Sequence, residues 1–331
     1  MSADNFITEF LNFTAGTSNR KVAYSQLGEL NAKNFFICLP GLLETRDSFH
    51  LLFSLVEKYS DCCWLSIDYC GRGLSDPLPI GENYTTSKYI EDVENLFEKL
   101  VIQQSKRNDK KIHIIGTSMG GILAMHVAKR NRVHLDSIIL NDIGLHLQWN
   151  ALLSLYQHIN QSKEEINQLK VDQRAVEAVY KRSHFDLPYE FDLTGMRFEN
   201  LLKDYTGHIV LMHNSQSPIC PTSIANQSKS RIADLKVWTS ENQGHPVQWD
   251  KILVSKLAHL TKIKLQPVEI IVKDPAISAF EVIQRISDTS LIAANILEVS
   301  KNAFIEQKTQ NQKKWVSDLL NRLRFWRRTF S

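Results

Sequence analysis

A serine in a glycine-rich turn is the strongest chemical signal in the sequence. Residues 116–121 read Gly-Thr-Ser-Met-Gly-Gly and place Ser118 in a G-x-S-x-G pattern. An apolar run at 112–115 precedes the motif, and a helical pattern at 122–130 follows it. In such a strand–turn–helix setting, small flanking residues let a sharp turn close and leave the serine hydroxyl exposed at the carboxyl end of a sheet. Ser118 is therefore the candidate nucleophile; a glycine-rich turn that merely contains a serine is the alternative.

A serine nucleophile needs a base, and His245 is the best placed of the eleven histidines. It lies in Gly-His-Pro at 244–246, directly after the last expected strand, which puts it at the same sheet edge as Ser118. The order of nucleophile before histidine agrees with that of enzymes built on this turn. Most other histidines fall inside expected strands or helices, where a structural role is more common.

Two backbone N–H groups are candidates to stabilise the oxyanion that forms when the serine attacks an acyl carbon. Met119 directly follows Ser118 and supplies one of them. The other is assigned to Leu42, in the segment Leu-Pro-Gly-Leu that follows an earlier expected strand. Gly41 permits the sharp turn there, although an ordinary Pro-Gly turn would have the same sequence.

Short apolar runs alternate with helical patterns over residues 8–266. Continuous apolar runs are typical of parallel strands buried on both faces, so the sequence predicts an α/β fold with a mostly parallel, doubly covered sheet. Helices are expected at 49–59, 87–103 (capped by Thr86 or Ser87) and 122–130. The expected strands lie at 35–39, 62–67, 112–115, 137–140, 209–212 and 235–238, with two antiparallel strands near 9–14 and 21–27.

Two segments break this alternation. Residues 145–192 have helical spacing and are predicted to form an inserted helical lid, after which the sheet resumes near Gly207. Residues 267–331 are predicted to form a helical extension that ends in a basic amphipathic helix. The chain is thus divided into a domain at 1–266 and a C-terminal extension at 267–331.

The amino-acid composition excludes several other classes of protein. With 331 residues, 43% hydrophobic and 23% charged, the chain has the make-up of a soluble globular protein. The net charge of +3 comes entirely from residues 267–331, so the main body has no basic excess for nucleic acid. Five cysteines, an odd number, favour buried thiols in a reducing compartment, and the absence of a secretory signal or an 18-residue apolar stretch makes the cytoplasm the expected location.

Several of these segments together resemble the α/β-hydrolase superfamily, in particular its serine esterases, lipases and carbon–carbon bond hydrolases. The resemblance covers about residues 8–265 and implies the α/β-hydrolase fold, a Ser–His–acid catalytic triad, a helical lid and no cofactor. The matching segments are Pro-Gly-Leu at 40–42, Asp-Tyr-Cys-Gly-Arg-Gly-Leu-Ser-Asp at 68–76, the serine motif at 116–121, Leu-Asn-Asp-Ile-Gly at 140–144 and Gly-His-Pro at 244–246.

The acid of the triad is where the sequence departs from the family. The acid normally follows the strand expected at 209–212, but residues 213–221 contain no carboxylate, and Ser217 or Pro218 occupies its place. Asp142 follows the strand expected at 137–140, next to the strand of the nucleophile, and is the substitute proposed here. Its alternative role is to organise the loop at the entrance of the lid. Pro40 also stands where the family usually has histidine, a smaller departure.

Asp68 and Arg72 are expected to hold together the loop that contains them rather than to act on a substrate. The sequence has no His-x-x-x-His or Cys-x-x-Cys spacing, so no metal site is predicted.

The sequence therefore predicts a cytoplasmic serine hydrolase acting on a small acyl ester or thioester, with Ser118, His245 and Asp142 as its triad. The alternative is a scaffold or binding protein built on a weakened hydrolase. Residues 275–331 would then be its working part, either on an anionic membrane or granule surface or in self-association. Residues 288–323 faintly resemble phasins, which coat polyester granules.

Overall fold

The computed structural model divides the chain into two units, Met1–Gln266 and Pro267–Ser331. It describes residues 6–15, 18–104, 108–130, 134–161, 170–181, 184–187, 190–191, 193–240 and 244–265. The predicted helices of the C-terminal extension, and their surface or self-association roles, lie outside the described residues.

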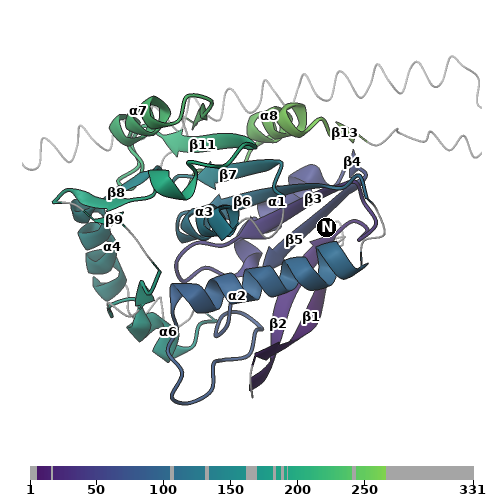
Figure 1. Cartoon of the computed structure of the whole chain (residues 1–331), viewed down its shortest axis with the longest axis horizontal. Coiled ribbons are helices and arrows are strands. Elements are labelled where there is room, and N and C mark those ends of the chain that lie inside the picture. Colours follow the sequence, from purple (N-terminus) through teal and green to yellow (C-terminus); the bar gives the residue numbers. More distant parts are fainter. Residues whose placement is uncertain are drawn as a thin grey trace, which may run out of the picture. The chain divides into compact units, whose positions relative to one another are not determined.

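A large, mostly parallel sheet forms the centre of the first unit (Figure 1). Within the described residues it has eight strands in the order β1-β2-β5-β3-β6-β7-β11-β12. The strands from β5 to β12 run parallel, and the N-terminal hairpin β1–β2 joins them in antiparallel fashion. The predicted fold class is confirmed. The bounds are β1 Ile7–Ala15, β2 Ser18–Leu27, β3 Asn34–Leu39, β5 Cys62–Ile67, β6 Lys111–Thr117, β7 Ser137–Asn141, β11 His208–Asn214 and β12 Lys236–Ser240.

Helices cover both faces of this sheet, as the continuous apolar runs predicted. Alternate residues of β3 show the two sides: Phe35 and Ile37 belong to one buried cluster, and Phe36 and Cys38 belong to the other. The first cluster includes side chains of α2 and α3, and the second includes side chains of α1 and α8. The helices of the main body are η1 Arg46–Phe49, α1 His50–Val56, α2 Thr86–Leu96, η2 Phe97–Gln104, α3 Met119–Arg130, α7 Thr222–Arg231 and α8 Lys251–Thr261.

The start of α2 differs slightly from the prediction. Its N-cap is Thr85, whose side chain accepts a hydrogen bond from the Lys88 N–H, so the cap lies one or two residues earlier than the expected Thr86 or Ser87. Beyond Leu96 the helix continues as the π-helical segment η2. A short ribbon, β4 Tyr59–Ser60 with β13 Lys264–Leu265, ties the end of the first unit back to the body.

The insertion between β7 and β11 contains helices, as expected, but also a small antiparallel sheet that the sequence did not predict. Strand β8 (His146–Gln148) pairs with β10 (Gly195–Arg197), and β10 pairs with β9 (Glu190–Phe191). The insertion extends past residue 192, through η4 (Glu199–Leu201), to the start of β11. Its helices are α4 Trp149–Gln161 and α6 Gln173–Ala178.

Candidate active site

Ser118 lies on a sharp turn between β6 and α3, where its φ of +48° puts it in the left-handed region. Non-glycine residues rarely adopt this conformation, and it is typical of strained functional turns. A Cβ at Gly116 would collide with the Gly120 carbonyl, and a Cβ at Gly120 would collide with the Leu39 carbonyl. The small residues of the motif are therefore required by backbone contacts on both sides of the serine.

Asp142 and His245 meet at the end of β7, although 103 positions separate them in sequence. His245 Nδ1 lies 2.7 Å from Asp142 Oδ2. The Asp142 side chain is fully buried, while that of His245 is 18% exposed. With Nδ1 donating to the carboxylate, Nε2 is left with its lone pair, which is the tautomer that a general base needs.

Two asparagines hold the segment that carries His245 against the sheet edge. Asn141, the last residue of β7, donates from Nδ2 to the Val247 carbonyl at 3.0 Å. Its own carbonyl accepts the N–H of Ser118 at 2.9 Å, so Asn141 links the nucleophile turn with the histidine segment. Asn214, the last residue of β11, donates from Nδ2 to the Gly244 carbonyl at 3.2 Å. The sequence analysis did not identify either asparagine as a site residue, although Asn141 directly follows an apolar run.

Ser217, at the position where the family's acid was expected, has a structural role in the loop after β11. Its hydroxyl oxygen accepts the N–H groups of Ile219 and Cys220, both at 3.1 Å, and its own N–H donates to the Asn214 carbonyl. Ser217 is 2% exposed. Burial, reinforced by the charge of Asp142, raises the pKa of the Cys220 thiol, so this neighbour of the carboxylate stays neutral.

The two proposed oxyanion donors come from adjacent loops. A Cβ at Gly120 would also approach the Pro40 carbonyl, which places the start of α3 against the segment that contains Leu42. Within the described part of the chain, neither the Leu42 N–H nor the Met119 N–H donates to another backbone group. Among the described residues, neither N–H group therefore holds the fold together through a loop or cap hydrogen bond to the backbone.

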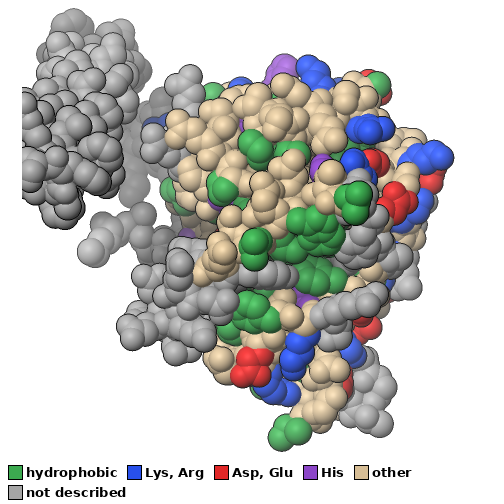
Figure 2. All heavy atoms as spheres, turned by 90° about the vertical axis from the view of Figure 1, so that its left-hand side faces the viewer, with side chains coloured by type: hydrophobic (Ala, Val, Ile, Leu, Met, Phe, Trp, Pro, Cys, Tyr) green, Lys and Arg blue, Asp and Glu red, His purple; other side chains and the backbone are tan. Residues whose placement is uncertain are grey.

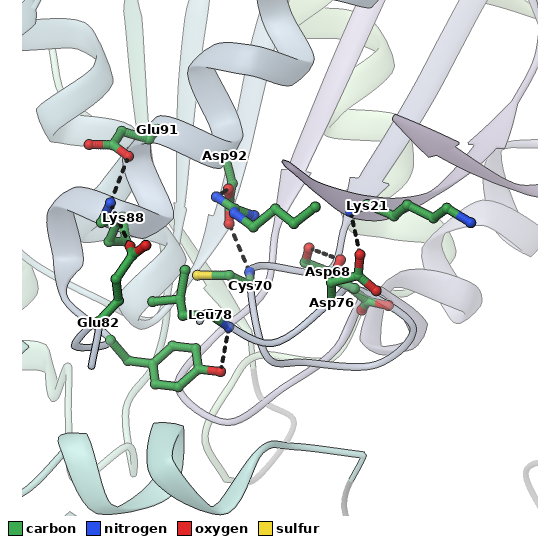
Figure 3. A network of polar contacts seen from close by, with 12 residues as sticks. Lys21, Asp68, Cys70, Asp76, Leu78, Glu82, Lys88, Glu91 and Asp92 are labelled. Atoms are coloured by element: carbon green, nitrogen blue, oxygen red, sulfur yellow. Dashed lines mark hydrogen bonds and ion pairs between the residues drawn. The ribbon is translucent and has the colours of Figure 1, made fainter. Parts of the chain in front are cut away.

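The loop that follows β5 is fixed to the body by a network of polar contacts (Figure 3). Asp68 is fully buried and accepts the N–H groups of Arg46 and Leu74, as well as the Arg46 guanidinium. Asp92 accepts the Cys70 N–H at 2.8 Å, and Asp76 accepts the Lys21 N–H at 2.6 Å. Asp68 thus has the structural role that the sequence analysis expected.

The insertion presents apolar side chains on its outer face. Figure 2 looks onto the side of the molecule that carries α4, and hydrophobic side chains gather near the middle of this view. On α4 itself, Leu153 is 57% exposed and Trp149 is 38% exposed. Among the described residues, no group of three or more potential ligand side chains is placed to hold a metal ion. No helix in the described residues is both long and apolar enough to cross a bilayer.

Comparison with known proteins agrees with this architecture. Residues 34–171 match the sequence family described as the alpha/beta hydrolase fold. An alpha/beta hydrolase from Novosphingobium aromaticivorans superposes with a TM-score of 0.58 at 18% identity, covering 79% of this chain and 99% of its own. The chain therefore has the α/β-hydrolase fold. A structure from a study of carboxylesterases of Nitrososphaera gargenis gives the same TM-score at 15% identity, over 76% of this chain and 99% of its own.

Curated relatives match this chain over shorter stretches. A 3-hydroxybutyrate-oligomer hydrolase from Cupriavidus necator is 29% identical over 133 residues, which are 40% of this chain and 42% of the relative. A serine hydrolase-like protein from Danio rerio is 31% identical over 106 residues, 32% of this chain and 30% of its own. The chain thus matches less than half the length of these relatives.

Proposed function

We propose that this chain is a serine hydrolase that cleaves a small carboxylic ester or thioester through an acyl-enzyme on Ser118. The observation that carries the proposal is the 2.7 Å contact between the buried Asp142 carboxylate and His245 Nδ1, at the sheet edge where the Ser118 turn lies. A buried carboxylate on the imidazole stabilises the cation that forms when the histidine takes a proton.

The proposed reaction has two stages. Ser118 Oγ attacks the acyl carbon while His245 Nε2 takes its proton, and the N–H groups of Leu42 and Met119 stabilise the oxyanion. The tetrahedral intermediate collapses, and the histidine returns the proton to the departing alcohol or thiol. Water, activated by the same nitrogen, then attacks the acyl-enzyme and releases the acid and the free serine.

A short hydroxy-acid ester is the substrate class that we favour. The Cupriavidus necator relative is named for hydrolysis of 3-hydroxybutyrate oligomers, which are chains of short ester units. Five unpaired, buried cysteines suit a reducing compartment, so we place the protein in the cytoplasm.

The alternative, a scaffold built on a weakened hydrolase, depended on the missing acid after β11. The Asp142–His245 contact supplies a carboxylate from β7 and so weakens that argument. A role for residues 267–331 in surface binding or self-association is compatible with either function and remains a separate proposal.

Turnover of a small panel of substrates tests the proposal. The panel is p-nitrophenyl butyrate, butyryl-coenzyme A and the 3-hydroxybutyrate trimer, each with the full chain. We expect hydrolysis of at least one, abolished in Ser118→Ala and retained in Ser230→Ala, which changes an exposed serine of α7. Equal hydrolysis by the wild type and Ser118→Ala would contradict the mechanism, and absence of any hydrolysis by folded wild type would favour the scaffold.

A further inference from the structure

One peptide group in the loop after β3 is bound at its carbonyl by a buried arginine. The carbonyl of Gly41 and the N–H of Leu42 belong to the same peptide unit. Arg72 Nη1 donates a hydrogen bond to that carbonyl at 2.9 Å. The Arg72 cation therefore hydrogen-bonds to the carbonyl of the peptide group whose N–H is the proposed oxyanion donor.

Arg72 lies in a buried setting beside two tyrosine rings. The residue is 1% exposed, and no described carboxylate lies within ion-pair distance of its guanidinium. The guanidinium instead lies over the rings of Tyr69 and Tyr89, 5.3 and 4.8 Å from their centroids. Its Nε and Nη2 atoms have no hydrogen-bond partner among the described residues. In such a poorly solvated site, a charge-assisted hydrogen bond is stronger than its counterpart in water.

The preceding peptide of the same loop is held by other groups. The Tyr69 hydroxyl donates to the Pro40 carbonyl at 3.1 Å, and the Gly41 N–H donates to Glu44 Oε2 at 2.8 Å. Burial raises the pKa of Tyr69 well above its ordinary value, so the phenol stays protonated and can donate. These contacts fix the position of the loop, but they act on a peptide other than that of the Leu42 N–H.

We propose that Arg72 is a positioning residue that orients the Leu42 N–H and makes it a stronger donor to the oxyanion. A hydrogen bond to a carbonyl draws electron density from the amide and strengthens the bond that the N–H on the same peptide can make. This inference rests on the proposed function, because the donor matters only if an oxyanion forms on Ser118. It gives Arg72 a part in catalysis beyond the loop-holding role expected from sequence.

The test compares Arg72→Gln, Arg72→Lys and Tyr69→Phe, with kcat and KM measured on the substrate that the wild type hydrolyses best. Loss of a whole oxyanion donor lowers kcat by about 10²–10³, so loss of its polarisation should lower kcat by about tenfold in Arg72→Gln. KM should stay within about twofold because the effect arises in the transition state. Tyr69→Phe, which loosens the loop without touching the Leu42 peptide, should lower kcat by only about twofold.

The outcomes separate the two proposals. Wild-type kcat in Arg72→Gln, or a fall no larger than that of Tyr69→Phe, overturns the role of Arg72 while leaving the hydrolase intact. A folded wild type without turnover overturns the proposed function, and this inference falls with it. If Arg72→Gln does not fold, Arg72→Lys decides: a shorter, single-point cation should lower kcat about threefold at constant KM, and an unchanged kcat contradicts the proposal.

Discussion

Strands β7 and β11 are neighbours in the sheet and end almost alike. Each finishes in an asparagine, Asn141 or Asn214, whose side-chain amide donates to a carbonyl of the segment around His245. The residues that follow the two strands differ. After β7, the Asp142 carboxylate contacts the His245 imidazole. After β11, the Ser217 hydroxyl accepts hydrogen bonds from backbone N–H groups of its own loop. Because parallel strands deliver their ends to one edge, the carboxylate can come from either strand.

Removing the Asp142 charge should have the largest effect. Asp142→Asn keeps the size of the side chain but removes the charge that stabilises the imidazolium and can reverse the tautomer of His245. We expect kcat on the best ester to fall by about 10³–10⁴ with the fold intact, as in other triads that lose their carboxylate. Steady-state kinetics and circular dichroism would measure both.

Ser217→Ala is the matched control in the same assay and should keep kcat within about twofold. A large loss of kcat in Ser217→Ala, or full activity in Asp142→Asn, would reverse the comparison between the two strand ends.

His113 is a buried histidine that contacts a hydroxyl group where His245 contacts a carboxylate. His113, on β6, is 2% exposed, and its Nδ1 lies 2.8 Å from the Ser137 hydroxyl rather than a carboxylate. Burial lowers its pKa to about 4. Since the unfolded state has the higher pKa, near 6.5, it binds the proton more readily, and stability is lost as the pH falls from about 6.5 towards 4.

We therefore expect the wild type to lose about 2 kcal/mol more of its unfolding free energy between pH 7 and pH 5 than His113→Gln loses. Urea unfolding of both proteins at the two pH values measures this difference. Parallel losses in the two proteins would show that His113 is protonated as readily in the folded state as in the unfolded state.

The two asparagines should also differ. Asn141 contacts both the Ser118 turn and the histidine segment, whereas Asn214 contacts the histidine segment and its own loop. Asn141→Ala should lower kcat about tenfold, because a small misplacement of reacting groups is costly in catalysis, and Asn214→Ala should lower it less. Kinetics of the two variants side by side would reveal the order, and a larger effect for Asn214 would contradict it.

The smallest effect expected is on stability. Ser217→Ala leaves two buried N–H groups without their acceptor, which should cost about 1–2 kcal/mol of unfolding free energy. Urea unfolding at pH 7 measures the cost. An unchanged midpoint would mean that the loop after β11 does not depend on this hydroxyl.

Much of the fold could be predicted from sequence because the signals are local. Short apolar runs indicated the six strands β3, β5, β6, β7, β11 and β12, and two antiparallel strands were expected near β1 and β2. The glycines around Ser118 are explained by backbone contacts within the turn and with Leu39. The small sheet of the insertion was missed because strands of two or three residues, such as β9 and β10, are too short to show a period.

The rest depends on contacts between residues far apart in the chain. Sequence could nominate Asp142 but not decide its role, because its partner lies 103 positions away. For the same reason, the contacts of Asn141 with the histidine segment and of Tyr69 with the loop of Leu42 were not foreseen. Each of these is a polar side chain whose function is defined only when the sheet brings two loops to one edge.

Labelling with a fluorophosphonate probe tests the central claim most directly, because the probe reacts only with an activated serine and needs no knowledge of the substrate. We predict one equivalent of label on Ser118 in the wild type, none in Ser118→Ala and labelling slowed by at least about 10² in Asp142→Asn. A folded wild type that does not react, or an Asp142→Asn variant that reacts at the wild-type rate, would contradict the assignment of Ser118, His245 and Asp142 as one catalytic unit.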